Sequence, residues 1–387
     1  MAGVIERQGL KYVQFGRSSL KVSELCIGTM TWGSFNGEET EAFAQLDRYW
    51  EAGVNFLDTA EIYPVAFNYG ETTEKWIGKW MKLRGIEREK IYIATKVNPA
   101  GVGSSDPPVK HGFEADRVLE ACTKSLARMG IDYIDLYQLH FPSRMGFAAF
   151  GWGSWGDASR YAEAKTSDSD KETFKRQVLA VKQLFDKGLI KDWGLSNENA
   201  YGLTMFCLVC DELGVPRPVS VQNDFSLNNR TYENDILEAA NNFGVVGLPY
   251  GALAGGVLTG KYDDPKYAGD RPLELSRHAS RPEFQTRYNN PTSRRAARDY
   301  QALAESYGLK PVELAYAWAN LRKYNGAVIT GTTTVGQVDD AISAFKISKL
   351  PEELLTKIDQ LHEKYRNPTA CLADKPLLNV ADFFGEK

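Results

Sequence analysis

Residues 54–63 are Val-Asn-Phe-Leu-Asp-Thr-Ala-Glu-Ile-Tyr, and this stretch decides the fold. It begins as an apolar run typical of a buried strand and turns polar at Asp58 and Tyr63. Two further apolar segments end in the same way, at Lys96 and at His140. In a barrel of parallel strands the carboxyl ends of the strands meet at one face, where active sites lie. We therefore expect these four side chains to come together.

Each of the four residues also has a purely structural explanation. Asp58 could cap a helix, and Tyr63 could be a packed aromatic with a hydrated hydroxyl. Lys96 could bury its stem at a strand end with its charge in water, and His140 could be a hydrogen-bonded core histidine. Their occurrence on successive predicted strands favours one common site.

Apolar segments of strand length alternate with helical periods along the chain, which predicts an α/β protein with a parallel sheet closed into a (β/α)8 TIM barrel. An amino-terminal β-hairpin is expected over 12–22. The predicted strands lie at 25–27, 56–57, 91–93, 134–139, 190–195, 219–221, 245–248 and 327–329. The predicted helices lie at 39–52, 72–82, 114–129, 171–187, 200–213, 232–243 and 334–345.

The chain has 387 residues, which is within the range that such barrels reach as one domain. We expect a single barrel domain over 1–387, with inserted loops at about 141–170 and 262–293 and a carboxyl-terminal extension at about 364–387. The first insert is rich in glycine, serine and large aromatics and follows His140. Either a lid over the carboxyl face or a loop packed on the barrel fits this composition.

The charge balance excludes some classes of partner. A formal net charge of −4 and a pI near 5.8 supply no basic field for nucleic acid or an anionic membrane, so neither is expected as a partner. The chain has no apolar run of the roughly 18 to 20 residues needed to span a membrane, and residues 1–7 lack the apolar core of a secretory signal, so secretion is not expected. Five cysteines fit a reducing compartment, so a cytoplasmic location is expected. The oligomeric state is not predicted.

Three motifs resemble known sites without completing them. Residues 255–262 nearly form a nucleotide-binding P-loop, but Tyr262 stands where a short hydroxyl must bind magnesium. Residues 101–106 lack the third glycine of a dinucleotide fingerprint and precede two prolines rather than a helix. Cys207 and Cys210 have zinc or redox spacing but no second pair of ligands, so buried core cysteines are expected. No metal site is predicted.

The four residues at the strand ends suit reduction of a carbonyl group. A phenol is a poor proton donor at neutral pH unless a nearby cation stabilises its ionised form. Lys96 would be that cation, and Asp58 would hold it through a buried ion pair. Tyr63 and His140 could then both donate to a carbonyl oxygen and stabilise its developing charge.

These residues stand within longer stretches that resemble the aldo-keto reductase superfamily, and more closely its bacterial, fungal and plant-type members related to potassium-channel β subunits. The resemblance runs from about Phe15 to about Leu361. It implies a barrel that binds NADP(H), usually in preference to NAD(H), without a Rossmann domain. The matching stretches are 28–30, 53–63, 70–74, 94–96, 135–140, 194–197 and 253–262.

The resemblance also implies roles for individual residues. Tyr63 would be the general acid/base, Lys96 and Asp58 would tune it, and His140 would polarise the carbonyl. Tyr250 would stack on the nicotinamide, whose carboxamide would bind Ser196, Asn197 and Gln222. The remaining implied cofactor contacts are Asp58, which is a cofactor contact as well as a catalytic residue, Gly28, Thr29 and Met30 in the first strand-to-helix turn, Leu253, Gly255 and Lys261 beside the pyrophosphate, and Thr333, Gln337 and Asp340 at the adenosine phosphate.

The chain departs from the family pattern around the cofactor. Gly251-Ala252 replaces a Ser-Pro pair after the stacking aromatic, and Ala341 replaces an asparagine that often contacts adenine. Residues 332–334 contain no Lys or Arg, so Arg287 or Arg281 from the long loop is expected to bind a 2′-phosphate. The substrate pocket is expected to include Tyr63 and His140, walled by Trp32, Trp152, Trp155 and the carboxyl-terminal segment.

The leading hypothesis is an NADPH-dependent reductase of small-molecule aldehydes or ketones. A nicotinamide-sensing regulatory subunit with little turnover is the alternative, because an intact set of four residues is expected of both. A barrel that binds sugars without redox chemistry would leave Lys96 and Asp58 unexplained.

Overall fold

The structure is a computed structural model that describes residues 4–33, 37–64, 72–99, 113–143, 168–282 and 284–369. Its centre is an eight-stranded parallel sheet in the order β10-β9-β8-β7-β6-β5-β4-β11. Each of the eight predicted segments contributes one strand. The strands are β4 (Leu25–Gly28), β5 (Phe56–Asp58), β6 (Tyr92–Val97), β7 (Ile134–Leu139), β8 (Ile190–Ser196), β9 (Ser220–Gln222), β10 (Val246–Gly247) and β11 (Val328–Gly331).

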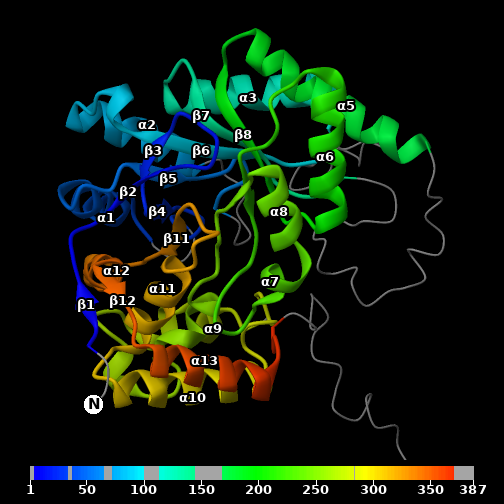
Figure 1. Ribbon diagram of the computed structural model, residues 1–387. Coiled ribbons are helices and arrows are strands. Elements are labelled where there is room, and N and C mark those ends of the chain that lie inside the picture. Colours follow the sequence, from blue (N-terminus) through cyan, green and yellow to red (C-terminus); the bar gives the residue numbers. More distant parts are fainter. Residues whose placement is uncertain are drawn as a thin grey trace, which may run out of the picture.

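Main-chain hydrogen bonds join the β10 segment to the segment that leads into β11. Gly247 N donates to Tyr324 O at 2.8 Å, Gly326 N donates to Gly247 O at 2.8 Å, and Ile329 N donates to Pro249 O at 2.9 Å. A sheet that closes on itself leaves no unpaired edge. The predicted (β/α)8 barrel is therefore confirmed (Figure 1).

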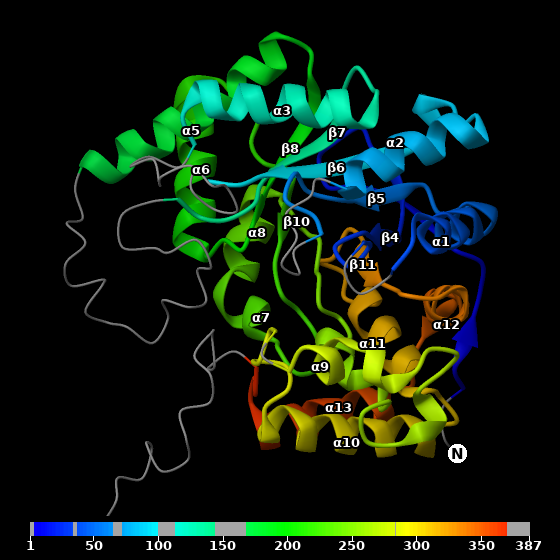
Figure 2. The ribbon, with the colours of Figure 1, turned by 180° about the vertical axis from the view of Figure 1, so that it is seen from behind.

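Helices lie outside the barrel and connect its strands (Figures 1 and 2). Where the sequence predicts one helix over 232–243, the structure has two that meet at Ile236. The helices between strands are α1 (Glu39–Glu51), α2 (Thr72–Arg84), α3 (Ala115–Met129), α5 (Asp168–Asp186), α6 (Ala200–Leu213), α7 (Thr231–Asp235), α8 (Leu237–Phe243) and α11 (Pro311–Asn320). After β11 come α12 (Val335–Phe345), β12 (Ile347–Lys349) and α13 (Glu352–Tyr365), and β12 pairs with β1 (Glu6–Arg7).

The expected hairpin is present and fills one end of the barrel. Strands β2 (Tyr12–Gln14) and β3 (Lys21–Ser23) pair antiparallel. Phe15, between them, is fully buried inside the barrel and meets the ring of Phe56 edge to face at 5.4 Å. The adjacent Gly16 lies against Val219 O and Val246, at the amino ends of β9 and β10. The hairpin therefore closes the amino end, and the carboxyl end carries the cavity.

The interval 262–293 contains more regular structure than the expected loop. It holds short helical turns η4 (Pro265–Tyr267) and η5 (Leu273–Leu275), helix α9 (Arg277–Ser280) and the start of α10 (Pro291–Ser306). Helices α10 and α13 lie side by side (Figure 2). Most of the other insert, 144–167, lies outside the described residues. Within the described part of the chain, no helix combines the length and the apolar character of a membrane span.

Candidate active site and cofactor cleft

A cavity of about 800 Å³ opens at the carboxyl ends of the barrel strands. Several of its lining residues end strands, namely Gly28 of β4, Asp58 of β5, Ser196 of β8, Gln222 of β9 and Gly331 of β11. This volume lies within the range of small-molecule and cofactor sites. The expected contacts Thr29 and Met30 line the cavity as well.

The structure brings together the four residues expected from the sequence. Lys96 is fully buried, and its Nζ donates to Asp58 Oδ2 at 2.5 Å, to Thr59 O at 2.8 Å and to Tyr63 Oη at 3.2 Å. The imidazole of His140 meets the ring of Tyr63 edge to face, with centroids 5.7 Å apart. Asp58, Tyr63 and His140 line the cavity. The phenol and the imidazole can therefore approach the same ligand atom.

Burial dominates the electrostatics of this group. Burial raises the pKa of Tyr63, and the attraction of Lys96 offsets only part of the rise. Burial disfavours the ammonium of Lys96, yet Asp58 and Tyr63 together hold the pKa of Lys96 above its ordinary value. Burial, reinforced by Lys96, lowers the pKa of His140 well below its usual range. At neutral pH the site therefore holds a neutral phenol, a neutral imidazole and a charged lysine.

The second oxygen of Asp58 has two further partners. Gln138 Nε2 donates to Oδ1 at 3.1 Å and Gln222 Nε2 at 2.8 Å, and Gln222 Nε2 also lies 2.9 Å from Gln138 Oε1. These amides satisfy the carboxylate lone pairs that Lys96 leaves open. Gln138 is not among the expected site residues, although its place two residues before His140 on a strand sends both side chains to the same face.

The four expected nicotinamide contacts form a wall joined by hydrogen bonds. Ser196 Oγ donates to Gln222 O at 3.0 Å, Asn197 Nδ2 donates to His140 O at 3.0 Å, and Tyr250 Oη donates to Asn197 Oδ1 at 2.7 Å. Asn197 has a φ of 56°, in the left-handed region that asparagine tolerates better than most residues. The wall is thus fixed by hydrogen bonds before any ligand arrives.

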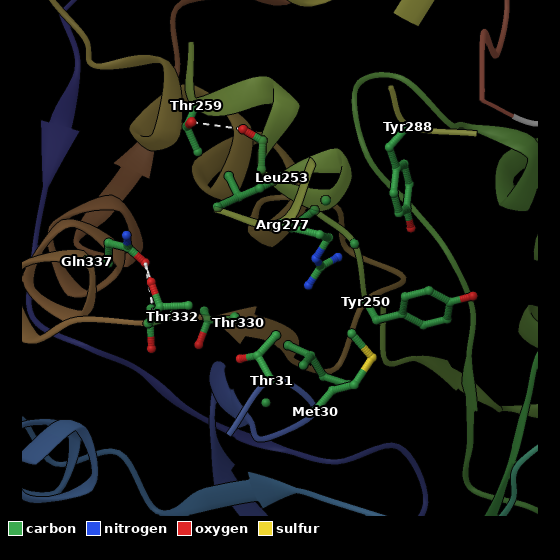
Figure 3. Close-up of a pocket in the computed structure, with 18 of the residues that line it drawn as sticks. Met30, Thr31, Tyr250, Leu253, Thr259, Arg277, Tyr288, Thr330, Thr332 and Gln337 are labelled. Atoms are coloured by element: carbon green, nitrogen blue, oxygen red, sulfur yellow. Dashed lines mark hydrogen bonds between the residues drawn. The ribbon is translucent and has the colours of Figure 1, made fainter. Parts of the chain in front are cut away.

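The middle of the cleft is electropositive. Lys261 lines the cavity, and burial together with Arg277 and Arg271 lowers the pKa of Lys261 to about 8. Leu253 and Arg277 lie in the same part of the cleft (Figure 3), and Gly255 also lines the cavity. Gly255 has a φ of 65°, and a Cβ there would lie 2.7 Å from the Tyr288 ring, so only glycine fits. Repulsion among these half-buried cations is relieved by an anion, so this region fits a pyrophosphate. Arg277 was not expected from the sequence.

The far end of the cleft is formed by the turn after β11 and the start of α12. Gln337 Oε1 accepts hydrogen bonds from Thr333 N at 2.9 Å and Thr333 Oγ1 at 3.1 Å. Asp340, one turn further along α12, also lines the cavity. Gln337 and Thr332 lie on the opposite side of the cleft from Tyr250 (Figure 3). The cavity therefore extends from Tyr250 to the turn after β11.

Two expected site residues have surroundings that differ from those expected. Arg287 is buried, with its Nε 3.1 Å from Asp224 Oδ2 and an NH2 donating to Tyr288 Oη at 2.8 Å. Arg287 lines the cavity, but its partner Tyr288 lies on the Tyr250 side of the cleft, away from Gln337 (Figure 3), which favours a different partner for a 2′-phosphate. Trp32 is fully buried in the core outside the barrel and does not line the described cavity. Trp152 and Trp155 lie outside the described residues.

The comparisons with known proteins agree with this architecture. The model of the aldo/keto reductase family matches residues 24–363. Protein tas of Escherichia coli is 34% identical over 367 residues, which are 93% of this chain and 99% of that protein. The uncharacterized oxidoreductase YrpG of Bacillus subtilis is 31% identical over 91% of this chain and 96% of its own length. A probable voltage-gated potassium channel subunit beta of rice (Oryza sativa) is 28% identical over 90% of this chain and 96% of its own length. The chain is therefore an oxidoreductase-type barrel that belongs to the aldo/keto reductase family.

Proposed function

We propose that the chain is an NADP(H)-dependent reductase of small-molecule aldehydes or ketones, with Tyr63 as the proton donor. The observation that carries this proposal is the contact of Tyr63 Oη with Lys96 Nζ at 3.2 Å on the wall of the cleft. The cationic centre of the cleft and the hydrogen-bonded wall around Tyr250 support a dinucleotide as the second reactant. When bound, the reduced nicotinamide would supply the hydride that reaches the carbonyl carbon.

The residues around the carbonyl would act on its oxygen. Tyr63 Oη and the imidazole of His140 donate hydrogen bonds to this oxygen and stabilise the charge that develops on it. Tyr63 then transfers its proton to the alkoxide, and the ammonium of Lys96 stabilises the phenolate that remains. Asp58 keeps Lys96 charged and in place. The raised pKa of Tyr63 keeps the phenol protonated at neutral pH, as a proton donor must be.

A nicotinamide-sensing regulatory subunit remains the second candidate, because a relative at 28% identity is named as a potassium channel subunit. The two candidates differ in turnover. We expect the chain to oxidise NADPH when aldehydes or ketones are added, as followed by absorbance. Cofactor binding that is tight but without turnover across a broad panel of aldehydes, ketones and open-chain sugars would favour the regulatory candidate.

The Tyr63→Phe variant tests the assignment of the proton donor. It should lower kcat by roughly 10²- to 10⁴-fold, the usual contribution of a positioned acid, and should leave NADPH affinity within about twofold. Tyr201→Phe is the matched control, because Tyr201 is an exposed tyrosine of α6 outside the cleft. Retention of most of the activity by Tyr63→Phe would remove Tyr63 from this role.

A further inference from the structure

The adenosine end of the cleft contains a cation that the sequence pattern does not place there. Lys310 precedes α11, and its Nζ lies 2.6 Å from Asp340 Oδ1 on α12. Both residues line the cavity, together with Thr333 and Gln337. Residues 332–334, where a basic partner is expected, have none. Lys310 reaches the same place from a different element.

The other cations on the cavity wall are placed for other contacts. Lys261 and Arg277 flank the glycine-rich turn in the middle of the cleft. Arg287 is buried against Asp224 on the Tyr250 side. Lys266 lies 3.0 Å from both Asp264 and Glu305, so two carboxylates surround it. Lys310 forms a salt bridge with Asp340, which is itself part of the adenosine end.

We propose that Lys310 binds the 2′-phosphate of NADP(H) and that it leaves Asp340 to do so. This inference rests on the proposed function, because it assumes that the cleft binds a nicotinamide dinucleotide. It makes the Lys310–Asp340 pair the determinant of the choice between NADP(H) and NAD(H).

The exposure of the pair makes the exchange feasible. The side chain of Lys310 is 59% exposed and that of Asp340 is 36% exposed. Ion pairs in contact with water contribute little to stability, so breaking this one costs little. A phosphate dianion offers Lys310 a stronger partner than a single carboxylate does. With NAD(H), Asp340 can instead accept a hydrogen bond from the ribose 2′-hydroxyl, as acidic residues do in other dinucleotide sites.

The test compares two pairs of ligands that differ only by the 2′-phosphate. Affinities of the full-length protein for NADPH and NADH, and for 2′,5′-ADP and 5′-AMP, are measured by calorimetry in low salt. We expect Lys310→Met to reduce the preference for the phosphorylated ligand of each pair by about tenfold, the size of one charge-assisted contact. Lys310→Arg should keep the preference. Asp340→Asn should increase it, because the substitution frees Lys310 and removes a repelling charge.

Arg48→Met is the matched control, because Arg48 forms an exposed pair with Asp339, the neighbour of Asp340, and does not line the cavity. This control should change neither affinity. If Lys310→Met and Arg48→Met leave the same ligand preference as the unmodified chain, Lys310 is only a surface ion-pair residue and the inference is wrong. If the unmodified chain binds neither NADPH nor NADH, the proposed function fails, and the inference fails with it.

Discussion

The ring of Phe141 lies flat on the imidazole of His140, with centroids 4.3 Å apart and planes 8° from parallel. The Nδ1 atom of His140 is buried and has no hydrogen-bond partner in the described part of the chain. The imidazole is therefore oriented by packing between Phe141 and the edge of Tyr63 rather than by a hydrogen bond. A buried lone pair costs less than a buried N–H without an acceptor, so the proton is expected on Nε2, the nitrogen that can donate to a carbonyl.

Phe141→Leu should therefore lower kcat for carbonyl reduction by roughly tenfold, because the imidazole of His140 loses its stacking partner and is no longer held in one orientation. Phe141→Tyr, which keeps the ring, should retain most of the activity. Steady-state kinetics and NADPH titration check this expectation. Equal losses in both variants, or a loss confined to NADPH affinity, would contradict a role in orienting His140.

Cofactor affinity should fall as the pH rises through about 8. Burial and the neighbouring Arg277 and Arg271 lower the pKa of Lys261 to about 8, so the ammonium is lost above that pH in the free protein. An anionic ligand favours the protonated form and raises this pKa on binding. Titrations of NADPH between pH 6.5 and 9.5 would show the decline.

Two variants of Lys261 isolate its contribution to that profile. Lys261→Arg keeps its charge throughout and should flatten the profile at high affinity. Lys261→Met should flatten it at an affinity lower by about tenfold. An unchanged slope in both variants would assign the pH dependence to another group.

Asp192 should destabilise the fold above pH 6. Burial, reinforced by Asp135, raises the pKa of Asp192 to about 6, so the folded chain holds this proton to higher pH than the unfolded chain does. Stability is therefore lost as the pH rises from about 4 through about 6. Asp192→Asn should raise the free energy of unfolding by roughly 1–2 kcal/mol at pH 8 and add little near pH 4. Urea unfolding at both pH values measures the difference, and an equal gain at both would contradict this cause.

Arg287 should matter for stability rather than for the choice of cofactor. Removing one partner of a buried pair leaves the other charge uncompensated, so Arg287→Met should cost roughly 3–5 kcal/mol of unfolding free energy. Adding Asp224→Asn should recover part of that loss. The ratio of NADPH to NADH affinity should not change in variants that remain folded. A selective loss of NADPH affinity would instead return Arg287 to the phosphate site.

The barrel was predictable because apolar strand segments and helical periods alternate regularly along the chain. Helices α10 and α11 were not predicted, and both begin with capping residues that hydrophobic periodicity does not include. Asn290 caps α10 by accepting from Thr292 N and Ser293 N, and Pro291 follows it as the first helical residue. Pro311 marks the start of α11 in the same way. Capping residues, considered together with hydrophobic periodicity, would have placed the end of the expected loop at 262–293 before Pro291.

The four clustered residues were predictable because strand ends meet at one face of a barrel. Contacts between side chains from distant loops were not, because spacing along the chain does not fix how a long loop folds back. Arg287 and Arg277 lie ten positions apart in that loop, yet Arg277 lines the cationic centre and Arg287 pairs with Asp224. The partner of Lys310 is 30 positions away, across two elements.

The two oxygens of Asp58 serve different parts of the cleft, since Oδ2 accepts from Lys96 and Oδ1 accepts from Gln222 of the expected nicotinamide wall. A change at this carboxylate therefore disturbs the proton donor and the wall at once. A substitution of Asp58 therefore cannot alter cofactor affinity without also altering the catalytic rate. Diversification of this scaffold would then be left to residues such as Lys310, whose charge can change without altering the strand ends.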